Sequence, residues 1–229
     1  MVSYISIHIP KTAGTTLGYL LDYGTSRRIL WDYCPDYSNA LLKPQEKEYL
    51  LKHKEFIEKQ FDVIHGHFYY SKYSWLFPNA KYITCVRHPV ARVISHFQHI
   101  MNEKNEQDYL YQAVKSNQID IIDFASIYDI GNAHTVHLKG QSIQDYDFIF
   151  INERFDESFY LFQKKFNFQR QDEYMNKNTI PFINKSENRN IKKLEFSNDI
   201  IQEIYKRTVD DNEIYKESIL IFEEIMKDF

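Results

Sequence analysis

The sequence contains few of the features that mark secreted or membrane-spanning proteins. Its 229 residues include two cysteines, Cys34 and Cys85, so no disulfide framework is indicated, and both are expected to be small core residues. The chain begins with strand-like residues rather than with a basic and then apolar export signal. No apolar run approaches the ~18 residues that a membrane-spanning helix needs. These absences favour a cytoplasmic protein without a membrane span.

The sequence also lacks a strong charge of either sign. A formal net charge of −4 argues against a general nucleic-acid binder, although it leaves room for a local basic site. The composition, 43% hydrophobic and 26% charged, is ordinary for a soluble globular protein. With no internal repeat and no interdomain linker, this length predicts a single domain over residues 1–229.

Apolar runs that are typical of buried strands alternate with helical stretches. Strands are expected at 4–9, 27–33, 62–68, 81–89 and 146–155, and helices at 14–24, 43–61, 90–101, 156–166, 197–208 and 210–227. The stretch 106–139 is expected to be mainly helical with a break at Gly131. Residues 167–193 are polar and rich in Asn and Lys, which indicates a long loop or mobile lid. The alternation predicts an α/β fold with a mainly parallel central sheet and helices on both faces.

Residues with useful chemistry follow the ends of several expected strands. Lys11 follows the first strand, His65 and His67 follow another, and Arg87 ends a third. Ligands of parallel sheets bind at the carboxyl ends of the strands. We therefore expect these four side chains to meet at one site.

The stretch "SIHIPKTAGTTLGYLL" predicts a strand, a tight loop and the start of a helix. Amide groups at a helix N-terminus bind anions, and Gly14 allows the backbone to approach the ligand closely. Lys11 supplies a positive charge, and Thr12, Thr15 and Thr16 supply hydroxyl donors. In the common phosphate loop the lysine directly follows the last glycine, whereas here it precedes Gly14 by three residues. The alternative interpretation is a capped helix with a surface lysine.

The stretch "CVRHPVARVISHF" predicts a second anion site. Arg87 leaves a strand end, Pro89 turns the chain, and Arg92 and Ser95 share a face of the next helix because they are three residues apart. The alternative is a solvated arginine beside a surface serine. Two anion sites at two strand ends suggest a ligand with two separated anionic groups.

These segments resemble the nucleotide-binding motifs of sulfotransferases that use 3′-phosphoadenosine 5′-phosphosulfate (PAPS). "PKTAGTT" is similar to their 5′-phosphosulfate loop, and "RHPVARVIS" is similar to their 3′-phosphate motif, with His88 where Asp or Asn is more usual. Three further segments resemble the carbohydrate branch related to heparan and uronyl 2-O-sulfotransferases, namely "HGHF" (65–68), "GNAHTVHL" (131–138) and "NERFDES" (152–158).

The resemblance implies a P-loop-like three-layer fold and in-line sulfuryl transfer from PAPS to an acceptor hydroxyl, without a metal. The branch favours a saccharide as the acceptor. His67 would be the base that deprotonates the hydroxyl, His65 would orient the loop or the substrate, and Lys11 would neutralise charge on the leaving oxygen. By the same resemblance the donor would be held by Lys11, Thr12, Ala13, Gly14, Thr15, Thr16, Arg87, Ser95 and, by analogy from "INKSENR", Lys185.

Three other functions remain open at this point. A P-loop kinase would need a Mg²⁺-binding carboxylate near a strand end, for which Glu153 is the nearest candidate. A metal hydrolase would use His65, His67, His96 and His99, although no HExxH or acidic partner accompanies them. A non-catalytic nucleotide-binding protein would bind the nucleotide without turnover.

Several other residues are assigned structural roles. His8 is expected to be packed inside a strand, and His96 and His99 to face solvent. Glu153 and Arg154 could form an internal ion pair that shapes the site. Two residues, Asn132 and Thr135, could line the cofactor pocket.

Overall fold

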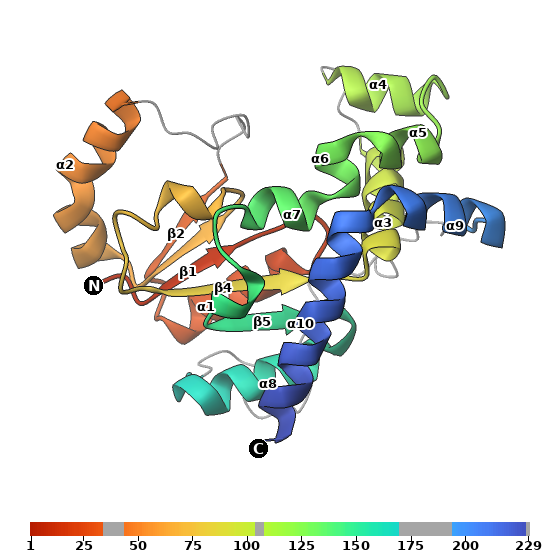
Figure 1. Cartoon of the computed structure of the whole chain (residues 1–229). Helices are drawn as coiled ribbons and strands as arrows, with labels where there is room; N and C mark the ends of the chain where they lie inside the picture. Colours follow the sequence, from red (N-terminus) through yellow and green to blue (C-terminus); the bar gives the residue numbers. More distant parts are fainter. Residues whose placement is uncertain (34–43, 104–107, 170–193, 228–229) are drawn as a thin grey trace.

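The computed structural model describes residues 1–33, 44–103, 108–169 and 194–227 (Figure 1). Its centre is a five-stranded sheet in the order β2-β3-β1-β4-β5, and every strand pair in it is parallel. The strands are short, apolar and mostly buried on both faces: β1 (Tyr4–Ile7), β2 (Ile29–Asp32), β3 (Val63–Gly66), β4 (Lys81–Val86) and β5 (Phe148–Ile151). Such strands need helices on both faces to keep them from water.

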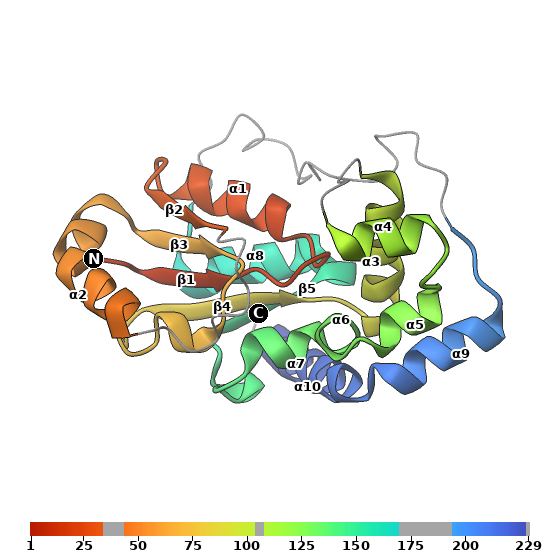
Figure 2. The same cartoon turned by 90° about the horizontal axis from the view of Figure 1, so that it is seen from above.

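Helices cover both faces of the sheet. α1 (Gly14–Gly24) and α8 (Phe155–Phe166) lie on one face, and α7 (Ala133–Leu138) and α10 (Val209–Lys227) lie on the other (Figure 2). α2 (Pro44–Gln60) lies near the amino ends of the strands and buries only Ile57. The expected three-layer α/β fold with a parallel central sheet is therefore confirmed.

A separate group of helices stands beyond the carboxyl ends of the strands (Figures 1 and 2). It consists of α3 (Pro89–Asn102), α4 (Tyr109–Lys115), α5 (Ile121–Ser126), α6 (Tyr128–Gly131) and α9 (Asn198–Arg207). These helices enclose a second apolar core around Val93, Phe124 and Ile204, apart from the main core between the sheet and its helices. We call this group the helical cluster.

The element boundaries follow local chemistry. Pro89 takes the first position of α3, where its missing N–H group costs nothing, so β4 stops at Val86 rather than at residue 89. β5 ends at Ile151 because a single 3-10 turn, Asn152–Arg154, leads directly into α8. Ser197 caps α9, as its sequence position predicts, by accepting a hydrogen bond from the Ile200 amide.

Two short 3-10 helices, Tyr70–Lys72 and Ile143–Asp145, complete the described elements. Within the described ranges, no helix combines the length and the apolar character that crossing a membrane requires. Most of the expected lid, residues 170–193, lies outside the described part of the chain, and Lys185 lies outside it as well.

Candidate active site

The loop between β1 and α1 has the backbone shape of an anion site. Lys11 and Ala13 adopt left-handed φ values of 71° and 66°, which for residues other than glycine cost on the order of 1–3 kcal/mol each. Among the described residues, no side chain caps the N-terminus of α1, which begins at Gly14. The amide groups of the first turn therefore remain available to an anionic ligand. Strain held at such a loop indicates a functional constraint on the backbone.

The three threonines of this loop differ in what they can offer a ligand. Thr12 is fully buried, and its hydroxyl donates to the carbonyl of Ile9 at 2.8 Å. This hydrogen bond stabilises the loop internally, so the expected contact between the Thr12 hydroxyl and a ligand is not supported. The backbone amide of Thr12 remains able to contact a ligand. Thr15 is half-buried and Thr16 is almost fully buried, both in the first turn of α1.

Gly14 is required because the ring of His8 lies directly against it. A Cβ atom at this position would lie 1.8 Å from Cδ2 and 2.2 Å from Nε2 of His8. Any other residue would have to displace the imidazole. His8 follows β1 instead of lying within it, and it is packed against the anion loop as a wall of the site.

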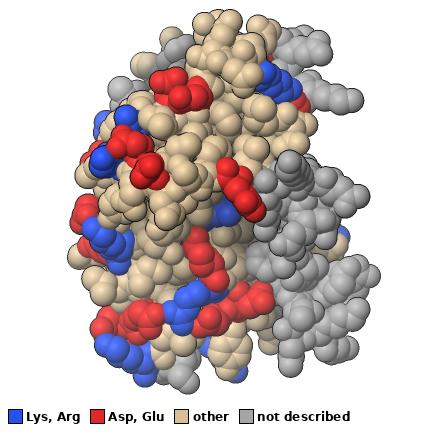
Figure 3. Space-filling view, turned by 90° about the vertical axis from the view of Figure 1, so that its right-hand side faces the viewer, with Lys and Arg blue, Asp and Glu red and all other residues tan. Residues whose placement is uncertain are grey.

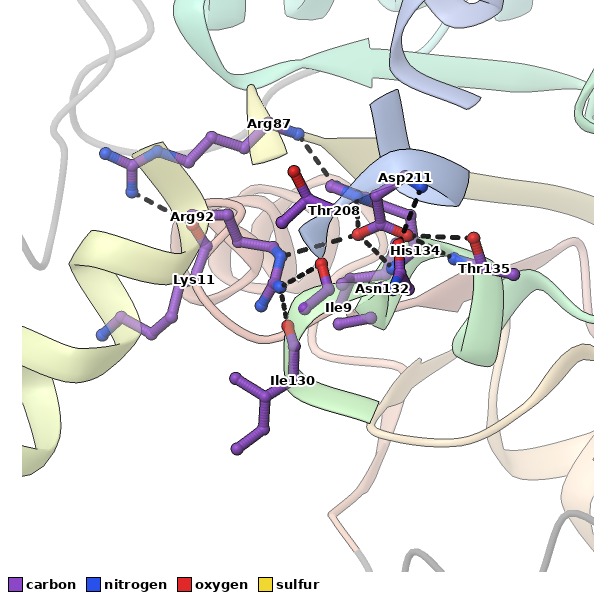
Figure 4. A network of polar contacts seen from close by, with 12 residues as sticks. Ile9, Lys11, Arg87, Arg92, Ile130, Asn132, His134, Thr135, Thr208 and Asp211 are labelled. Carbon is purple, nitrogen blue, oxygen red and sulfur yellow. Dashed lines mark hydrogen bonds and ion pairs between the residues drawn. The ribbon is translucent and has the colours of Figure 1, made fainter. Parts of the chain in front are cut away.

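Arg87 links the second anion site to the first. It leaves the end of β4, and its Nη1 donates to the carbonyl of Lys11 at 3.1 Å (Figure 4). Its Nε is buried and has no hydrogen-bond partner within the described residues. Burial lowers the pKa of the guanidinium, while nearby Glu153 opposes that change. A buried donor without a partner is a strong candidate for a ligand contact. Ser95 is half-buried on α3.

Arg92 contacts the helices behind the anion site, which its spacing does not predict, and its Nε and Nη1 are buried without a hydrogen-bond partner among the described residues. Its guanidinium is fully buried, donates to the carbonyls of Ile130 and Gly131, and lies 3.8 Å from Asp211. Burial lowers the pKa of Arg92 to about 10, although Asp211 acts in the opposite direction. The helix face that spacing assigns to Arg92 is covered by α6 and by the start of α10, so the residue holds these helices together.

Asp211 is the centre of a buried network that the sequence gives little reason to suspect (Figure 4). It accepts hydrogen bonds from the His134 amide at 3.0 Å, from His134 Nδ1 at 2.6 Å, and from both the amide and the hydroxyl of Thr135. Asn132 accepts from the Asp211 amide at 3.2 Å and donates to the carbonyl of Arg207. Asn132 and Thr135 therefore serve this network, and their expected role as pocket lining is not supported.

The network reaches the anion site through His134. Nε2 of His134 accepts a hydrogen bond from the Arg87 amide at 3.2 Å, so the proton of a neutral ring is on Nδ1, where it is donated to Asp211. Burial alone would raise the pKa of Asp211, but the neighbouring His134, its hydrogen bond and then Arg92 hold that pKa below the ordinary value. The start of α10 thus fixes the backbone from which Arg87 projects.

Glu153 supports the same turn from the other side. Its carboxylate accepts hydrogen bonds from the His88 amide at 2.9 Å and from the Tyr215 hydroxyl at 3.1 Å. Arg154 pairs instead with Glu157 and Glu223. The ion pair expected between Glu153 and Arg154 is therefore not formed. The only carboxylate considered for a kinase-type metal site is occupied in holding the His88 backbone.

Three histidine rings lie together beside the anion loop. His8 stacks on His65 with ring centroids 5.3 Å apart and meets His67 edge-on at 4.4 Å. His65 is fully buried, and its Nδ1 lies 2.9 Å from the Ser6 hydroxyl on the neighbouring strand. His67 is half-buried, one residue beyond the end of β3, with the ring of Tyr33 4.8 Å away.

These histidines are held in the neutral state. Burial, followed by the neighbouring His137, lowers the pKa of His67 to about 3. Burial and then His67 lower the pKa of His65 to about 3, against a backbone hydrogen bond with Gly14 that acts to raise it. The pKa of His8 is likewise well below its ordinary value, because of burial and then of His67 and His65. A neutral imidazole can accept a proton.

His96 is also part of the surroundings of the site, and the expectation that it faces solvent was wrong. Its ring meets Phe124 edge-on at 5.2 Å, and its Nδ1 is buried. Burial, then Arg92 and Lys11, lower the pKa of His96 to about 3. His99 lies one turn further along α3 and pairs with Glu103 at 3.5 Å. Within the described ranges, no group of three or more His, Cys, Asp or Glu side chains is arranged to hold a metal ion.

The helical cluster forms the outer wall of this region. On the side of the molecule that it occupies, acidic and basic side chains are interspersed, and basic atoms lie inside a hollow between them (Figure 3). The described residues of that face therefore carry no extended field of one sign.

One of the comparisons with known proteins identifies a family. A family model described as the sulfotransferase family matches residues 3–218. Among solved structures, a sulfotransferase from Alicyclobacillus acidocaldarius is 12% identical with a TM-score of 0.47, over 93% of this chain and 94% of that one. Mouse sulfotransferase SULT7A1 complexed with PAP is 14% identical with a TM-score of 0.44, over 99% of this chain and 84% of that one. A comparison with curated proteins gave no match.

Proposed function

Because the chain belongs to the sulfotransferase family, its chemistry is sulfuryl transfer, and we propose that its donor is PAPS and its acceptor a hydroxyl of a saccharide. When bound, PAPS supplies the sulfuryl group. The chain's own residues hold the donor at two anionic groups, neutralise charge at the leaving oxygen and take the proton of the acceptor.

The observation that carries the proposal is the joining of two anion-binding elements. The strained loop with its uncapped helix start would hold the 5′-phosphate, through loop amides at Thr12, Ala13 and Gly14 and through the hydroxyls of Thr15 and Thr16. Arg87, with its buried Nε, and Ser95 would hold the 3′-phosphate. The Arg87–Lys11 hydrogen bond fixes the two elements relative to each other. A donor with two separated phosphates fits this arrangement better than a nucleotide with one phosphate chain.

Lys11 and His67 are proposed to act on the reacting groups. Lys11 lies at the mouth of the anion loop, where its ammonium would stabilise negative charge that grows on the leaving oxygen. His67 is more exposed than the fully buried His65. A ring with a pKa of about 3 is a weak base at neutral pH, so His67 would take the acceptor's proton once the bound anionic donor has raised that pKa. His65 would position this element through its contact with Ser6. The proposal therefore assigns proton transfer to His67 and positioning to His65.

The proposal is tested first by donor selectivity. PAP should raise the melting temperature more than ADP or ATP does, with or without Mg²⁺, because a ligand of the native state stabilises it. Arg87→Ala should weaken PAP strongly and adenosine 5′-phosphosulfate little, while Arg207→Ala on α9 serves as a control. Equal stabilisation by ATP and PAP would overturn the donor assignment, and a requirement for Mg²⁺ would favour a kinase.

The acceptor is tested separately with radiolabelled sulfate. The wild-type chain and PAPS are incubated with panels of oligosaccharides, phenols, tyrosine peptides and small alcohols. Transfer to at least one saccharide is expected. Binding of PAP without transfer to any panel member would instead indicate a non-catalytic nucleotide-binding protein.

A further inference from the structure

A strip of exposed aromatic rings leads up to the histidines. It consists of Tyr19 on α1, Trp31 on β2 and Tyr33 just beyond β2, and their exposed fractions are 38%, 39% and 41%. The rings of Tyr19 and Trp31 are 5.6 Å apart, and those of Trp31 and Tyr33 are stacked at 6.2 Å with planes 21° apart. We call these three residues the aromatic strip. None of the sequence motifs accounts for it.

The aromatic strip is built into the fold rather than left at its surface. Trp31 pairs in register with His65 on β3 and meets its ring edge-on at 5.5 Å. Gly18 of α1 makes room for both, because a Cβ atom there would lie 2.6 Å from the Trp31 ring and 2.7 Å from the His65 ring. The absence of a side chain at Gly18 thus lets the indole lie between the helix and the sheet. Such support keeps the ring in one orientation.

The aromatic strip ends at the proposed base. The Tyr33 ring lies 4.8 Å from that of His67, with planes 68° apart. The Tyr33 hydroxyl is 2.9 Å from Nδ1 of His8, whose ring covers Gly14 in the anion loop. A molecule lying along the aromatic strip would therefore reach His67 on the side of the anion loop.

The side chains of the aromatic strip carry no charge, and the charged residue between two of them is turned away. Asp32 lies between Trp31 and Tyr33 in sequence, but alternation along a strand turns its side chain to the opposite face. There its carboxylate pairs with Lys72 at 2.6 Å and accepts from the Tyr73 hydroxyl at 2.9 Å. The carboxylate is thereby removed from the face that carries the rings.

We propose that the aromatic strip of Tyr19, Trp31 and Tyr33 is the acceptor subsite, and that it takes the apolar face of an uncharged sugar ring next to the reacting hydroxyl. This inference rests on the proposed function and names the substrate chemistry of that site. One face of a pyranose exposes C–H groups, which pack on exposed aromatic faces, while its hydroxyls stay at the rim. The same geometry would place a hydroxyl at His67.

The test measures binding without turnover. Chains carrying Trp75→Phe, so that Trp31 is the remaining tryptophan, are saturated with PAP and titrated with cellotetraose, maltotetraose, chitotetraose and lactose while the indole fluorescence is followed. At least one of these neutral sugars should change the emission of Trp31. Tyr19→Ala should then weaken that sugar about tenfold, equivalent to ~1.4 kcal/mol, whereas Tyr160→Ala, an exposed tyrosine on α8, should leave it unchanged.

Each outcome decides the proposal. If PAP still binds but no neutral sugar changes the emission, the proposed subsite is overturned and the donor assignment stands. If the Trp75→Phe chain does not bind PAP, the proposed function itself is refuted. The same titration is made with 2-naphthol, a phenol, and with heparosan, a charged glycan. A response to either of these two alone also overturns the assignment to an uncharged sugar. The sugar that responds is then used as the substrate. Trp31→Ala should raise the KM for this sugar and should hardly change the melting temperature of the PAP complex. An unchanged KM would exclude Trp31 from the subsite.

Discussion

Lys11 shows how one residue can serve the fold of a loop and the chemistry above it. Its left-handed backbone shapes the anion loop, and its carbonyl receives the Arg87 guanidinium. The proposed function assigns its ammonium to the leaving oxygen. Removing the side chain keeps the backbone carbonyl, so the two roles can be separated by mutation.

We expect Lys11→Ala to lower kcat far more than it weakens PAP. Charge on the leaving oxygen grows only in the transition state, so a group that stabilises this charge contributes mainly there. A loss of about 10²-fold or more fits removal of one preorganised group. Single-turnover rates at saturating PAPS and the Kd of PAP measure the two effects. Near-normal turnover would reduce Lys11 to a binding residue.

The two histidines of "HGHF" should separate in the same kind of assay. His67→Ala should abolish transfer while PAP still binds, whereas His65→Ala should lower both the rate and the melting temperature, because it removes a buried ring that contacts Ser6. Full activity of His67→Ala together with an inactive but stably folded His65→Ala would move the base to His65.

The pH dependence of the rate follows from the pKa of His67. Because this pKa is about 3 in the structure, the ring stays neutral as pH falls through 6.5, and kcat/KM should remain flat there. Anionic groups of a bound donor favour the protonated ring, so the pKa seen in kcat should be higher than that seen in kcat/KM. A fall of kcat/KM with a midpoint near 6.5 would show that His67 is not held in this state.

At the scale of elements, the start of α10 acts on the site without touching it. Asp211 fixes the tautomer of His134, and His134 receives the amide of Arg87. In Asp211→Asn the amide group can offer a donor to Nδ1, which shifts the ring proton to Nε2 and ends the contact with Arg87. The guanidinium should then lose its fixed position.

We expect Asp211→Asn to lower the selectivity for PAP over adenosine 5′-phosphosulfate by about tenfold. The neighbouring Asp210→Asn is the matched control, because Asp210 bonds the Tyr128 hydroxyl at the surface. Asp211→Asn will also be less stable than the wild type, since Arg92 loses its buried charged partner. The ratio of the two affinities, measured on folded protein, is insensitive to that loss. An unchanged ratio would limit Asp211 to a role in stability.

The elements also show what the sequence can and cannot predict. Lys11, His67 and Arg87 each follow a buried strand, and His65 lies near the end of β3, so the rule that parallel strands bring their carboxyl ends to one edge could place these residues on the same side of the sheet. The role of Arg92 could not be found, because the spacing of three along α3 does not reveal that α6 and α10 cover that face. Asp211 and His134 are 77 residues apart in the chain, and no local pattern joins them.

The sequence also says little about the role of Trp31 and Tyr33. Trp31 and Tyr33 alternate as any half-buried strand does, and only the position of Gly18 beneath the indole distinguishes a supported ring from a surface one. The sequence does not reveal that Trp31 lies beside His65, because that follows from the sheet order, which places β2 next to β3.

At the scale of the whole molecule, buried neutral histidines make stability depend on pH. The pKa values of His65, His67 and His96 are about 3 and that of His137 is about 4, against 6.5 in the unfolded chain. Between pH 6.5 and 4 the unfolded chain therefore binds protons that the folded chain does not. Each such histidine therefore lowers the free energy of unfolding as pH falls through this window.

The melting temperature should consequently be highest above pH 6.5 and fall steeply toward pH 5. Asp211, whose pKa is lowered, adds a further loss only below its unfolded value of 3.8, so it does not account for this window. His96→Gln should make the slope shallower than in the wild type. A melting temperature that stays constant from pH 7.5 to 5 would show that the native histidines titrate normally.

The helical cluster is formed by two separate parts of the chain. The first part runs from α3 to α6, and the second is α9, which follows β5 and α8 in the sequence. The second apolar core therefore closes only when Ile204 arrives near the end of the sequence. During synthesis the sheet strands are all available before that moment, whereas α3 and α5 must wait with apolar faces uncovered. The contacts of α9 with α3 and α5 join residues far apart in the sequence, so we expect the cluster to be completed late in folding. Arg87 is held through His134 by α10, and α10 follows α9 directly in the sequence. We therefore expect the nucleotide site to be assembled last. A nascent chain that lacks α9 and α10 should not bind the donor tightly.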